Sequence, residues 1–414
     1  MAEKKHVLYI SYDGMTDPLG QSQVIPYLVA LSNRGFAFTI LSFEKKAKYE
    51  ERKELIQNLL DSAGIKWSPL LYTKWPPVIS TLYDYARLKR TVANLHQSMK
   101  FDFVHCRSYI PALAGLAFKR KYNLQFIFDM RGFWADERVD GNLWNLKNPV
   151  FKTIYRFFKK KEIEFIREST AVITLTQAAK EEILTWKDLQ IDSEKITVIP
   201  CCVDTALFDP DKITKAQQQQ ARQQLNMNED DFVLGYLGSI GTWYLLDEML
   251  QFFTSAKSII HKAKFLFVTQ DEPLHIIDRA TYFGLKPEDI IITKAERKEV
   301  PIMISLFNYG IFFIKPAYSK IASSPTKQGE IMAMGVPVIC NSGVGDSDNI
   351  IHSYQSGLVV SAGYYDGVVK KLQVEESDPQ LIRNGAVDYF SLNKGTDEYL
   401  NVYHNLIKPY NNAI

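Results

Sequence analysis

The sequence predicts an α/β protein built from two Rossmann-like domains, each a doubly wound parallel sheet. Three observations support this fold class. The chain has 414 residues, which is enough for two hydrophobic cores. Its first half alternates strand-length apolar runs with stretches of helical periodicity, as parallel sheets do. A second series of the same kind begins near residue 231, after a polar run rich in glutamine.

The expected strands fall into two groups with a composition shift between them. Those of the first group are the apolar runs at 6–11, 37–43, 102–106, 124–129 and 171–175. Those of the second group are at 231–237, 264–269, 289–293, 310–314 and 336–340. The crossover at 195–210 contains a strand, a proline and a turn, and the run QQQQARQQ follows it. We therefore expect an N-terminal domain over 1–200 and a C-terminal domain over 201–378.

The charge is distributed unevenly along the chain. The first 200 residues carry 30 Lys and Arg against 22 Asp and Glu, whereas the remainder carries 19 against 25. A basic first half indicates an anionic partner, either a phospholipid surface or a phosphorylated acceptor. Nucleic acid is the weaker option, because no helix-turn-helix, zinc-finger or aromatic RNA-binding signature accompanies the charge.

Targeting and redox signals point to the cytoplasm. No stretch approaches the roughly 18 consecutive apolar residues of a membrane span. The N-terminal apolar run is only of strand length, which is too short for a signal peptide. The chain has four cysteines without CxxC spacing, which predicts reduced, buried thiols: Cys106, Cys201, Cys202 and Cys340.

The stretch 323–340, SSPTKQGEIMAMGVPVIC, carries the strongest functional signal. It predicts a helix that begins near Thr326 and ends at Gly335, followed by a buried strand. A helix start attracts phosphate, Lys327 adds a full charge, and Glu330 lies one turn on, where its carboxylate can accept from sugar hydroxyls. In the alternative interpretation, Thr326 is an ordinary N-cap and Lys327 is solvated.

The end of this stretch resembles the donor-site helix of retaining glycosyltransferases of family 4. The matching residues are Glu330 and the run Gly335, Val336, Pro337 and Val338. The resemblance implies a GT-B fold, with two domains facing a cleft that holds a nucleotide sugar, and a retaining reaction that needs no metal or other cofactor. It assigns Glu330 to the nucleotide ribose. It also implies that helices over 379–414 cross back to the N-terminal domain.

The sequence departs from the family pattern around the donor sugar and diphosphate. The family has a second Glu eight positions before the first, where this chain has Ala322, with Lys320 and Ser324 beside it. The family also places Arg and Lys around the glycine turn after the first strand of the C-terminal domain. The turn here carries uncharged residues, Ser239, Gly241 and Thr242. We therefore expect Lys327 to supply the charge for the diphosphate.

Two further loops are expected to contribute to the site. By resemblance, the first loop of the N-terminal domain faces the donor diphosphate through Gly20, Gln21 and Ser22, and Lys294 and Ala295 hold the nucleobase. Asp346-Ser347-Asp348 is formally a DxD metal motif, but its Gly-rich helix entry favours a capping role.

The strand ends of the N-terminal domain carry the expected catalytic and acceptor residues. His105 is either a catalytic group or a hydrogen-bonded structural residue, and Arg107 follows it. Arg131 is expected to clamp an anionic group of the acceptor. The acceptor side is completed by Trp134, Asp136 and Glu137, although this loop also fits an ion-paired surface with an aromatic plug.

The expected function is therefore transfer of a sugar, from UDP rather than GDP, to a glycan or lipid-linked acceptor in cell-surface polysaccharide or glycolipid synthesis. Two basic aromatic segments, 71–90 and 148–168, are candidates for peripheral contact with an anionic membrane at its inner face. The second segment fits an ordinary packing helix equally well. The alternatives are a nucleotide-sugar epimerase, and a non-catalytic protein that binds nucleotide sugars or lipids.

Overall fold

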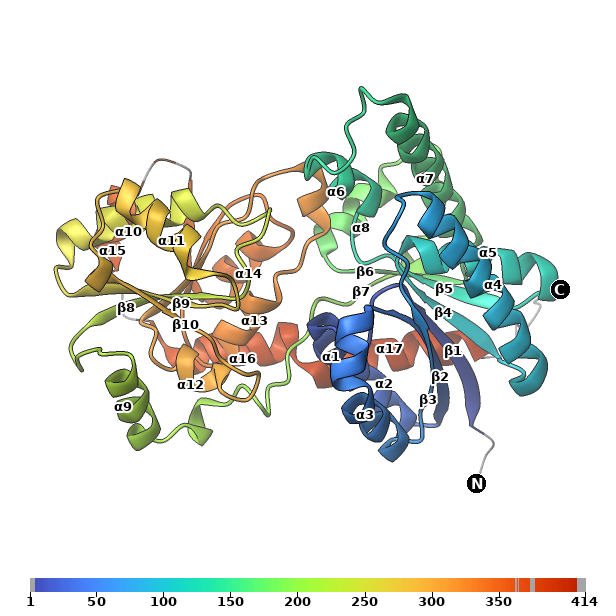
Figure 1. Ribbon diagram of the computed structural model, residues 1–414, viewed down its shortest axis with the longest axis horizontal. Helices are drawn as coiled ribbons and strands as arrows, with labels where there is room; N and C mark the ends of the chain where they lie inside the picture. The colour runs from blue at the N-terminus through green and yellow to red at the C-terminus, as the bar shows by residue number, and fades with distance from the viewer. Residues whose placement is uncertain (1–3, 362, 364, 373–376, 408–414) are drawn as a thin grey trace. The chain divides into compact units, whose positions relative to one another are not determined.

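The computed structural model describes residues 4–361, 363, 365–372 and 377–407 (Figure 1). The chain divides into two compact units, Met1–Pro200 with Leu392–Ile414, and Cys201–Ser391. Each unit contains one sheet in which every strand pair is parallel. The prediction of two doubly wound parallel sheets is confirmed.

The first unit has a seven-stranded sheet in the order β3-β2-β1-β4-β5-β6-β7. Its strands are β1 (Lys5–Ser11), β2 (Phe36–Glu44), β3 (Lys66–Leu71), β4 (Phe103–Arg107), β5 (Gln125–Asp129), β6 (Ala171–Thr174) and β7 (Ile196–Val198). Its helices are α1 (Pro18–Gln23), α2 (Ile25–Ser32), α3 (Lys46–Ser62), α4 (Ile79–Met99), α5 (Tyr109–Tyr122), α6 (Trp134–Asp140), α7 (Pro149–Glu168), α8 (Gln177–Leu184) and α17 (Leu392–Ile407).

Helices cover both faces of this sheet, with α4, α5 and α7 on one and α2, α3 and α17 on the other (Figure 1). The central strands therefore consist of buried residues, and all five side chains of β4 are buried. A sheet of this order has its switch point between β1 and β4, where such folds bind ligands at the carboxyl ends of the strands.

The second unit has a six-stranded sheet in the order β10-β9-β8-β11-β12-β13. Its strands are β8 (Phe232–Leu237), β9 (Ala263–Val268), β10 (Ile290–Thr293), β11 (Tyr309–Phe312), β12 (Val338–Asn341) and β13 (Gly357–Val360). Its helices are α9 (Lys215–Gln224), α10 (Leu246–Ile259), α11 (Pro273–Tyr282), α12 (Val300–Ile304), α13 (Thr326–Ala333), α14 (Ser347–Tyr354), α15 (Asp366–Lys371) and α16 (Pro379–Phe390). The switch point here lies between β8 and β11.

The return of the chain to the first unit comes later than the sequence suggested. The expected crossing begins at 379, but α16 packs against α13 and α14 and belongs to the second unit. Of the described helices after 379, α17 is the one assigned to the first unit, where it packs on α2. The apolar residues Ile382, Ala386 and Phe390 of α16 explain the difference, because they complete the core of the second unit.

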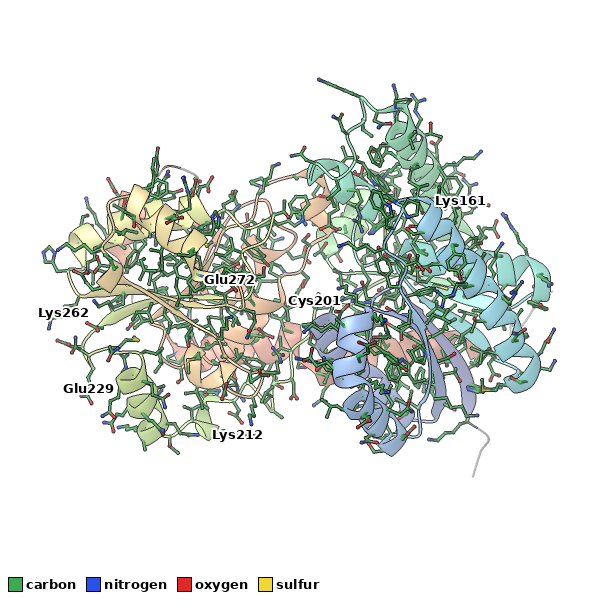
Figure 2. The ribbon with its side chains drawn as sticks, viewed as in Figure 1. Lys161, Cys201, Lys212, Glu229, Lys262 and Glu272 are labelled. Carbon is green, nitrogen blue, oxygen red and sulfur yellow. The ribbon has the colours of Figure 1, made fainter. Side chains whose placement is uncertain are left out.

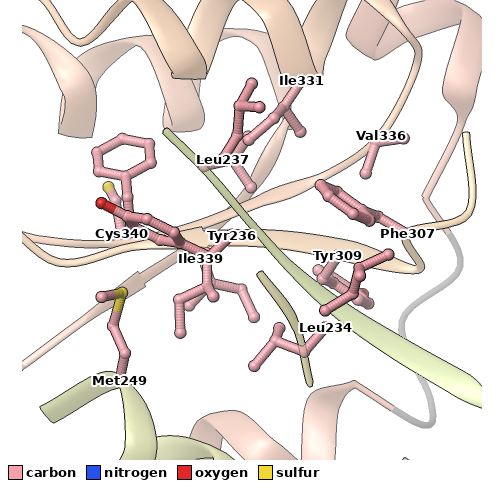
Figure 3. Close-up of a cluster of buried hydrophobic side chains, with 14 of the residues drawn as sticks. Leu234, Tyr236, Leu237, Met249, Phe307, Tyr309, Ile331, Val336, Ile339 and Cys340 are labelled. Carbon is pink, nitrogen blue, oxygen red and sulfur yellow. The ribbon is translucent and has the colours of Figure 1, made fainter. Parts of the chain in front are cut away.

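The helix α13 is seated directly on the second sheet. Figure 3 shows Ile331 of α13 above the core residues of β8, β11 and β12, including Tyr236, Tyr309 and Ile339. The helix comes this close because β11 has a glycine beneath it. A Cβ added at Gly310 would lie 2.7 Å from the Ile331 side chain.

We expect Gly310→Ala to destabilise the protein by about 1–3 kcal/mol, because the added methyl group overpacks a buried and branched side chain. Urea denaturation measures the loss. Gly367→Ala is the matched control, since it lies in α15 with nothing within 4 Å of the new Cβ. This control should be neutral or more stable by about 0.5–1 kcal/mol. Equal stabilities for the two variants would contradict the close seating of α13.

All four cysteines are buried and form no disulfide. In the part of the chain that the structure describes, no helix is both long and apolar enough to span a membrane.

Candidate functional site

The ammonium group of Lys327 lies in a box of two aromatic rings at the switch point of the second sheet. Its Nζ is 4.0 Å from the ring centroid of Tyr236 and 3.5 Å from that of Tyr244. An antiparallel β-bridge with Ile314 fixes the backbone of Tyr244. Nζ is buried and has no hydrogen-bond partner among the described residues. The alternative of a solvated Lys327 is therefore wrong.

The environment of Lys327 favours the binding of an anion to its ammonium group. Burial lowers the pKa of the ammonium well below its usual value, and the carboxylates of Glu330 and Asp271 offset this effect only in part. Its cation–π contacts compensate some of the lost hydration. Three N–H donors of a buried cation remain to be satisfied, and a phosphate group could accept from them.

The start of helix α13, beside Lys327, is not capped by the side chain at its N-cap position. Helix α13 begins at Thr326, so its N-cap is Pro325, which makes no side-chain capping bond. The alternative in which Thr326 is an ordinary N-cap is wrong, because Thr326 is already the first helical residue. The unpaired amides of a first turn and the helix dipole favour an anion here.

Glu330 lies on the same helix and is bound to an arginine that the sequence did not single out. Its carboxylate is buried and accepts a hydrogen bond from Nη1 of Arg297, whose guanidinium lies 4.6 Å from the Phe208 ring centroid. Burial raises the pKa of Glu330, and Arg297 and Lys327 oppose this rise. Arg297 lies in the loop after β10, and no motif in the sequence marks it.

The glycine turn after β8 is fixed by a carboxylate. Asp271 accepts from the Ser239 hydroxyl at 3.0 Å and from the Ile240 amide at 2.7 Å. Gly238 and Gly241 have φ of +97° and +47°, which side chains disfavour. A Cβ at Gly238 would lie 3.6 Å from Lys327 Nζ, so this turn borders the aromatic box. The Ser239 hydroxyl therefore shapes the turn.

The remaining predicted donor residues have varied surroundings. Lys320 is buried with Nζ 3.6 Å from the Trp243 ring centroid. The Ser324 hydroxyl accepts from the Cys201 amide at 3.1 Å and so anchors the crossover. Thr242 and Lys294 are exposed, and the Ala295 carbonyl accepts from Gln270 at 3.1 Å.

The carboxylate of Asp346, in the DxD sequence, is hydrogen-bonded within the second unit. Asp346 occupies the N-cap position of α14 but makes no capping bond, and its carboxylate accepts instead from the Tyr389 hydroxyl at 2.7 Å. The described residues contain no group of three or more His, Cys, Asp or Glu side chains arranged to hold a metal ion.

In the first unit, two arginines surround one buried carboxylate at the carboxyl ends of β4 and β5. Asp129 Oδ1 lies 3.8 Å from Nη1 of Arg131, and Oδ2 lies 3.9 Å from Nη1 of Arg107. Burial raises the pKa of Asp129, but Arg131, His105 and Arg107 outweigh it, so the net shift is downward. Nε and Nη1 of Arg107 are buried and have no hydrogen-bond partner among the described residues. Asp13 Oδ2 lies 3.6 Å from Nε of Arg107, so the two arginines face two carboxylates, and Arg107 keeps buried N–H donors that could serve an anionic group.

His105 is enclosed by hydrogen-bonding partners. Its ring nitrogens lie 3.2 Å from Oδ2 of Asp129 and 2.8 Å from the hydroxyl of Tyr403, and Tyr399 bonds the same Asp129 oxygen at 3.2 Å. Burial lowers the pKa of His105 despite the Asp129 carboxylate. A small cavity adjoins it, lined partly by Tyr9 and the two α17 tyrosines. These contacts favour the structural interpretation, in which His105 holds Asp129 in place.

The buried carboxylate of Glu44 fixes the first loop of the first unit. It accepts hydrogen bonds from the Met15 and Thr16 amides at 2.8 and 3.1 Å. A Cβ at Gly20 would meet the Gly14 carbonyl at 2.3 Å, so this glycine is required by close backbone packing. The Gln21 amide donates to the Thr16 carbonyl at 3.0 Å. Both predicted residues therefore fix the shape of the loop.

Two of the residues assigned to the acceptor are packed inside the first unit. The Trp134 ring stacks on Tyr109 with centroids 5.6 Å apart. Asp136 is buried and accepts from Tyr155 and Lys159 of α7, each at 2.8 Å. These contacts join α6 to α7 and favour the interpretation of an aromatic plug. The structure leaves Glu137 partly buried in the same helix.

Comparison with known proteins gives consistent matches for both units. A family model described as Glycosyltransferase Family 4 matches residues 23–207, and one described as Glycosyl transferases group 1 matches residues 217–385. No curated protein gives a significant match.

The chain is also similar to solved structures over nearly its whole length. A glycosyltransferase from Rickettsia africae has a TM-score of 0.71 at 15% identity, covering 98% of this chain and 99% of that one. Anabaena Alr3699/HepE in complex with UDP-glucose gives 0.68 at 14%, covering 97% and 99%. UDP-GlcNAc 2-epimerase from Neisseria meningitidis bound to UDP-GlcNAc gives 0.57 at 13%, covering 97% and 100%. These likenesses confirm the expected GT-B-like fold.

Proposed function

Because the chain belongs to glycosyltransferase family 4, we propose that it transfers a sugar from a nucleoside-diphosphate donor to a glycan or lipid-linked acceptor. The observation that carries this proposal is Lys327, a buried cation that has no hydrogen-bond partner among the described residues and lies beside a helix start without a side-chain cap. A protein keeps such a costly arrangement where an anion completes it. The diphosphate of a nucleotide sugar has the charge to do so.

The chemistry follows from charge stabilisation. The bond between the anomeric carbon and the diphosphate oxygen breaks, the acceptor hydroxyl oxygen forms the new bond, and its proton leaves. Negative charge grows on the departing diphosphate, where Lys327 and the first amides of α13 stabilise it. Members of this family generally retain the anomeric configuration. We assign retention to this protein too, without a protein nucleophile or a metal ion.

We place the donor site in the second unit. Glu330 accepts hydrogen bonds from the ribose hydroxyls, and the backbone at 294–295 holds the base. Around the diphosphate and sugar we place Ser239, Gly241, Thr242, Lys320, Ser324 and Thr326. Gly20 and Gln21 of the first unit are assigned to the donor by the family resemblance alone. Gln21, Ser239 and Ser324 use their side chains within the fold, so we assign them a positioning role.

The acceptor side lies in the basic first unit. Arg107 and Arg131 bind an anionic group of the acceptor, and His105 positions Asp129 between them. An acceptor of this kind fits cell-surface polysaccharide or glycolipid assembly. In that role the protein works in the cytoplasm, in peripheral contact with the inner face of the membrane.

An epimerase is the second candidate, because the same fold occurs in the Neisseria enzyme. It would act without an acceptor, so formation of an epimerised nucleotide sugar from donor alone would favour it. Tight donor binding without transfer or hydrolysis would favour the non-catalytic alternative.

Nucleotide binding tests the donor site. We expect UDP to raise the melting temperature more than GDP, ADP, CMP or dTDP, since a ligand at 100 times its Kd adds about 2.7 kcal/mol. Glu330→Ala should abolish the effect, while Glu229→Ala, an exposed position labelled in Figure 2, should leave it unchanged. If no nucleotide raises the melting temperature of the wild-type protein, the donor site is not where we place it.

A further inference from the structure

The loop after β3 and the first turns of α4, located in Figure 1, carry an unusual number of exposed apolar side chains. Of the twenty large hydrophobic residues that are exposed among the described positions, seven lie within 71–83, which we call the α4 tip. They are Leu71, Tyr72, Trp75, Val78, Ile79, Leu82 and Tyr83. Such a concentration marks an interaction site rather than scattered surface residues.

The most exposed side chains point away from the core. Trp75 is 77% exposed, and Ile79, Leu82 and Tyr83 are 63%, 63% and 56% exposed. The last three share one helix face by their spacing. The opposite face of α4 contains the buried residues Ser80, Asp84, Leu88 and Val92. The apolar face of the α4 tip is therefore an outer face, which no described residue covers.

The α4 tip is held in a fixed shape. The buried carboxylate of Asp84 accepts from the Thr73 amide at 3.0 Å, from the Thr73 hydroxyl at 2.8 Å and from the Tyr12 hydroxyl at 3.0 Å. Val78 has φ of +68°, a strained conformation for a branched residue. Strain of this kind is retained where a loop has a function.

The exposed charged residues within 71–90 all have one sign. Lys74 lies in the loop, and Lys89 and Arg90 follow on the exposed side of α4. The one acid within 71–90 is Asp84, which is buried and hydrogen-bonded. An exposed apolar end with cations behind it is the pattern of a segment that enters the interface of an anionic membrane.

We propose that the α4 tip docks on an anionic phospholipid bilayer, with Trp75, Ile79 and Leu82 entering the interface and Lys89 and Arg90 contacting the headgroups. This inference rests on the proposed membrane contact and names its surface. A lipid surface fits better than a protein partner, because Lys74 and Lys89 accompany the apolar side chains, and lysine is depleted from protein interfaces but attracted to an anionic membrane surface.

The other candidate segment, α7, has a different environment. Its apolar residues Phe158, Phe165 and Ile166 are buried, and the helix packs on α5 and α6. It exposes only two large apolar side chains, Val150 and Phe157. Helix α7 is therefore a packing helix, and it supplies the matched controls.

Sedimentation with vesicles tests the proposal in the full-length protein. Wild type should bind vesicles of phosphatidylcholine with phosphatidylglycerol and not those of phosphatidylcholine alone. The triple change Trp75→Ser, Ile79→Ser and Leu82→Ser should weaken binding by about 100-fold or more. Lys89→Glu with Arg90→Glu should weaken it by about tenfold or more. The controls Phe157→Ser and Lys160→Glu should change it by less than about threefold.

A second readout reports insertion directly. Because the native thiols are buried, an environment-sensitive dye on Leu82→Cys labels this position selectively and should shift to the blue on anionic vesicles. Binding that survives the triple change, or that is lost with the α7 variants instead, overturns the proposal. UDP should still stabilise the triple variant, because these exposed changes do not touch the donor site. This measurement distinguishes a failure of the docking proposal from a failure of the proposed donor site.

Discussion

Lys327→Met is expected to lower turnover by about 10²–10³ and, at the same time, to stabilise the nucleotide-free protein. The turnover falls because methionine supplies no charge to the departing diphosphate. The stability rises by about 1 kcal/mol, because a buried cation without hydrogen bonds is replaced by an apolar side chain that still fills the box of Tyr236 and Tyr244. Steady-state kinetics and urea denaturation measure the two effects.

The pH dependence of this stability difference has a definite sign. The pKa of Lys327 is lower in the folded chain than its unfolded value of about 10.4. Between these two pKa values the unfolded chain binds more protons, so the stability of the wild-type protein rises with pH there. The advantage of Lys327→Met should therefore be largest below the lowered pKa and shrink toward pH ~10.

The control for this experiment is Lys262→Ala, an exposed lysine of the same unit that is labelled in Figure 2. It should leave both turnover and stability nearly unchanged. If Lys327→Met lowers turnover by less than about threefold, Lys327 does not stabilise the leaving group.

Arg297→Gln is expected to weaken nucleoside-diphosphate binding by about tenfold near neutral pH, because it removes the partner that keeps Glu330 ionised. The groups that face Glu330 are Arg297, Lys327 and Tyr244. Without Arg297, burial raises the pKa of Glu330 further, so the carboxylate form that accepts from ribose hydroxyls is lost at a higher pH. Calorimetric titration with UDP over a range of pH measures the shift.

In both proteins affinity should fall as pH decreases through the pKa of Glu330, with a higher midpoint in Arg297→Gln. The free energy of unfolding changes with pH in the opposite direction. Above pH ~4.3 folded Glu330 binds more protons than the unfolded chain, so the folded protein becomes less stable as pH rises through this window. Arg297→Lys should restore most of the affinity. Arg279→Gln, which breaks a partly exposed pair with Asp247 away from Glu330, is the control. An unchanged midpoint would show that Arg297 does not govern Glu330.

The sequence predicted the central strands of both sheets and missed two strands at the edges. Buried strands such as β4 are continuous apolar runs and can be recognised locally. Strand β3 contains Pro69 and is only partly buried, which its position at the edge of the sheet permits. Strand β13 is short and begins with Gly357, so its pattern is weak.

Sequence and tertiary structure contributed different parts of the candidate site. Lys327 and Glu330 stand in one recognisable helix start, and the glycine turn at 238–241 follows a recognisable strand, so the sequence by itself determined the family, the fold and the start of helix α13, which we propose as the donor helix. The groups that complete the site come from separate segments and carry no motif: Arg297, Asp271, Tyr236 and Tyr244 in the second unit, and Asp129, Tyr399 and Tyr403 in the first. Within each unit, only the folded chain brings these groups together, because burial and pairing depend on contacts between residues far apart in sequence. Those contacts leave Lys327 without a hydrogen-bond partner among the described residues, pair Glu330 with Arg297, and give His105 and Asp136 hydrogen bonds inside the first unit.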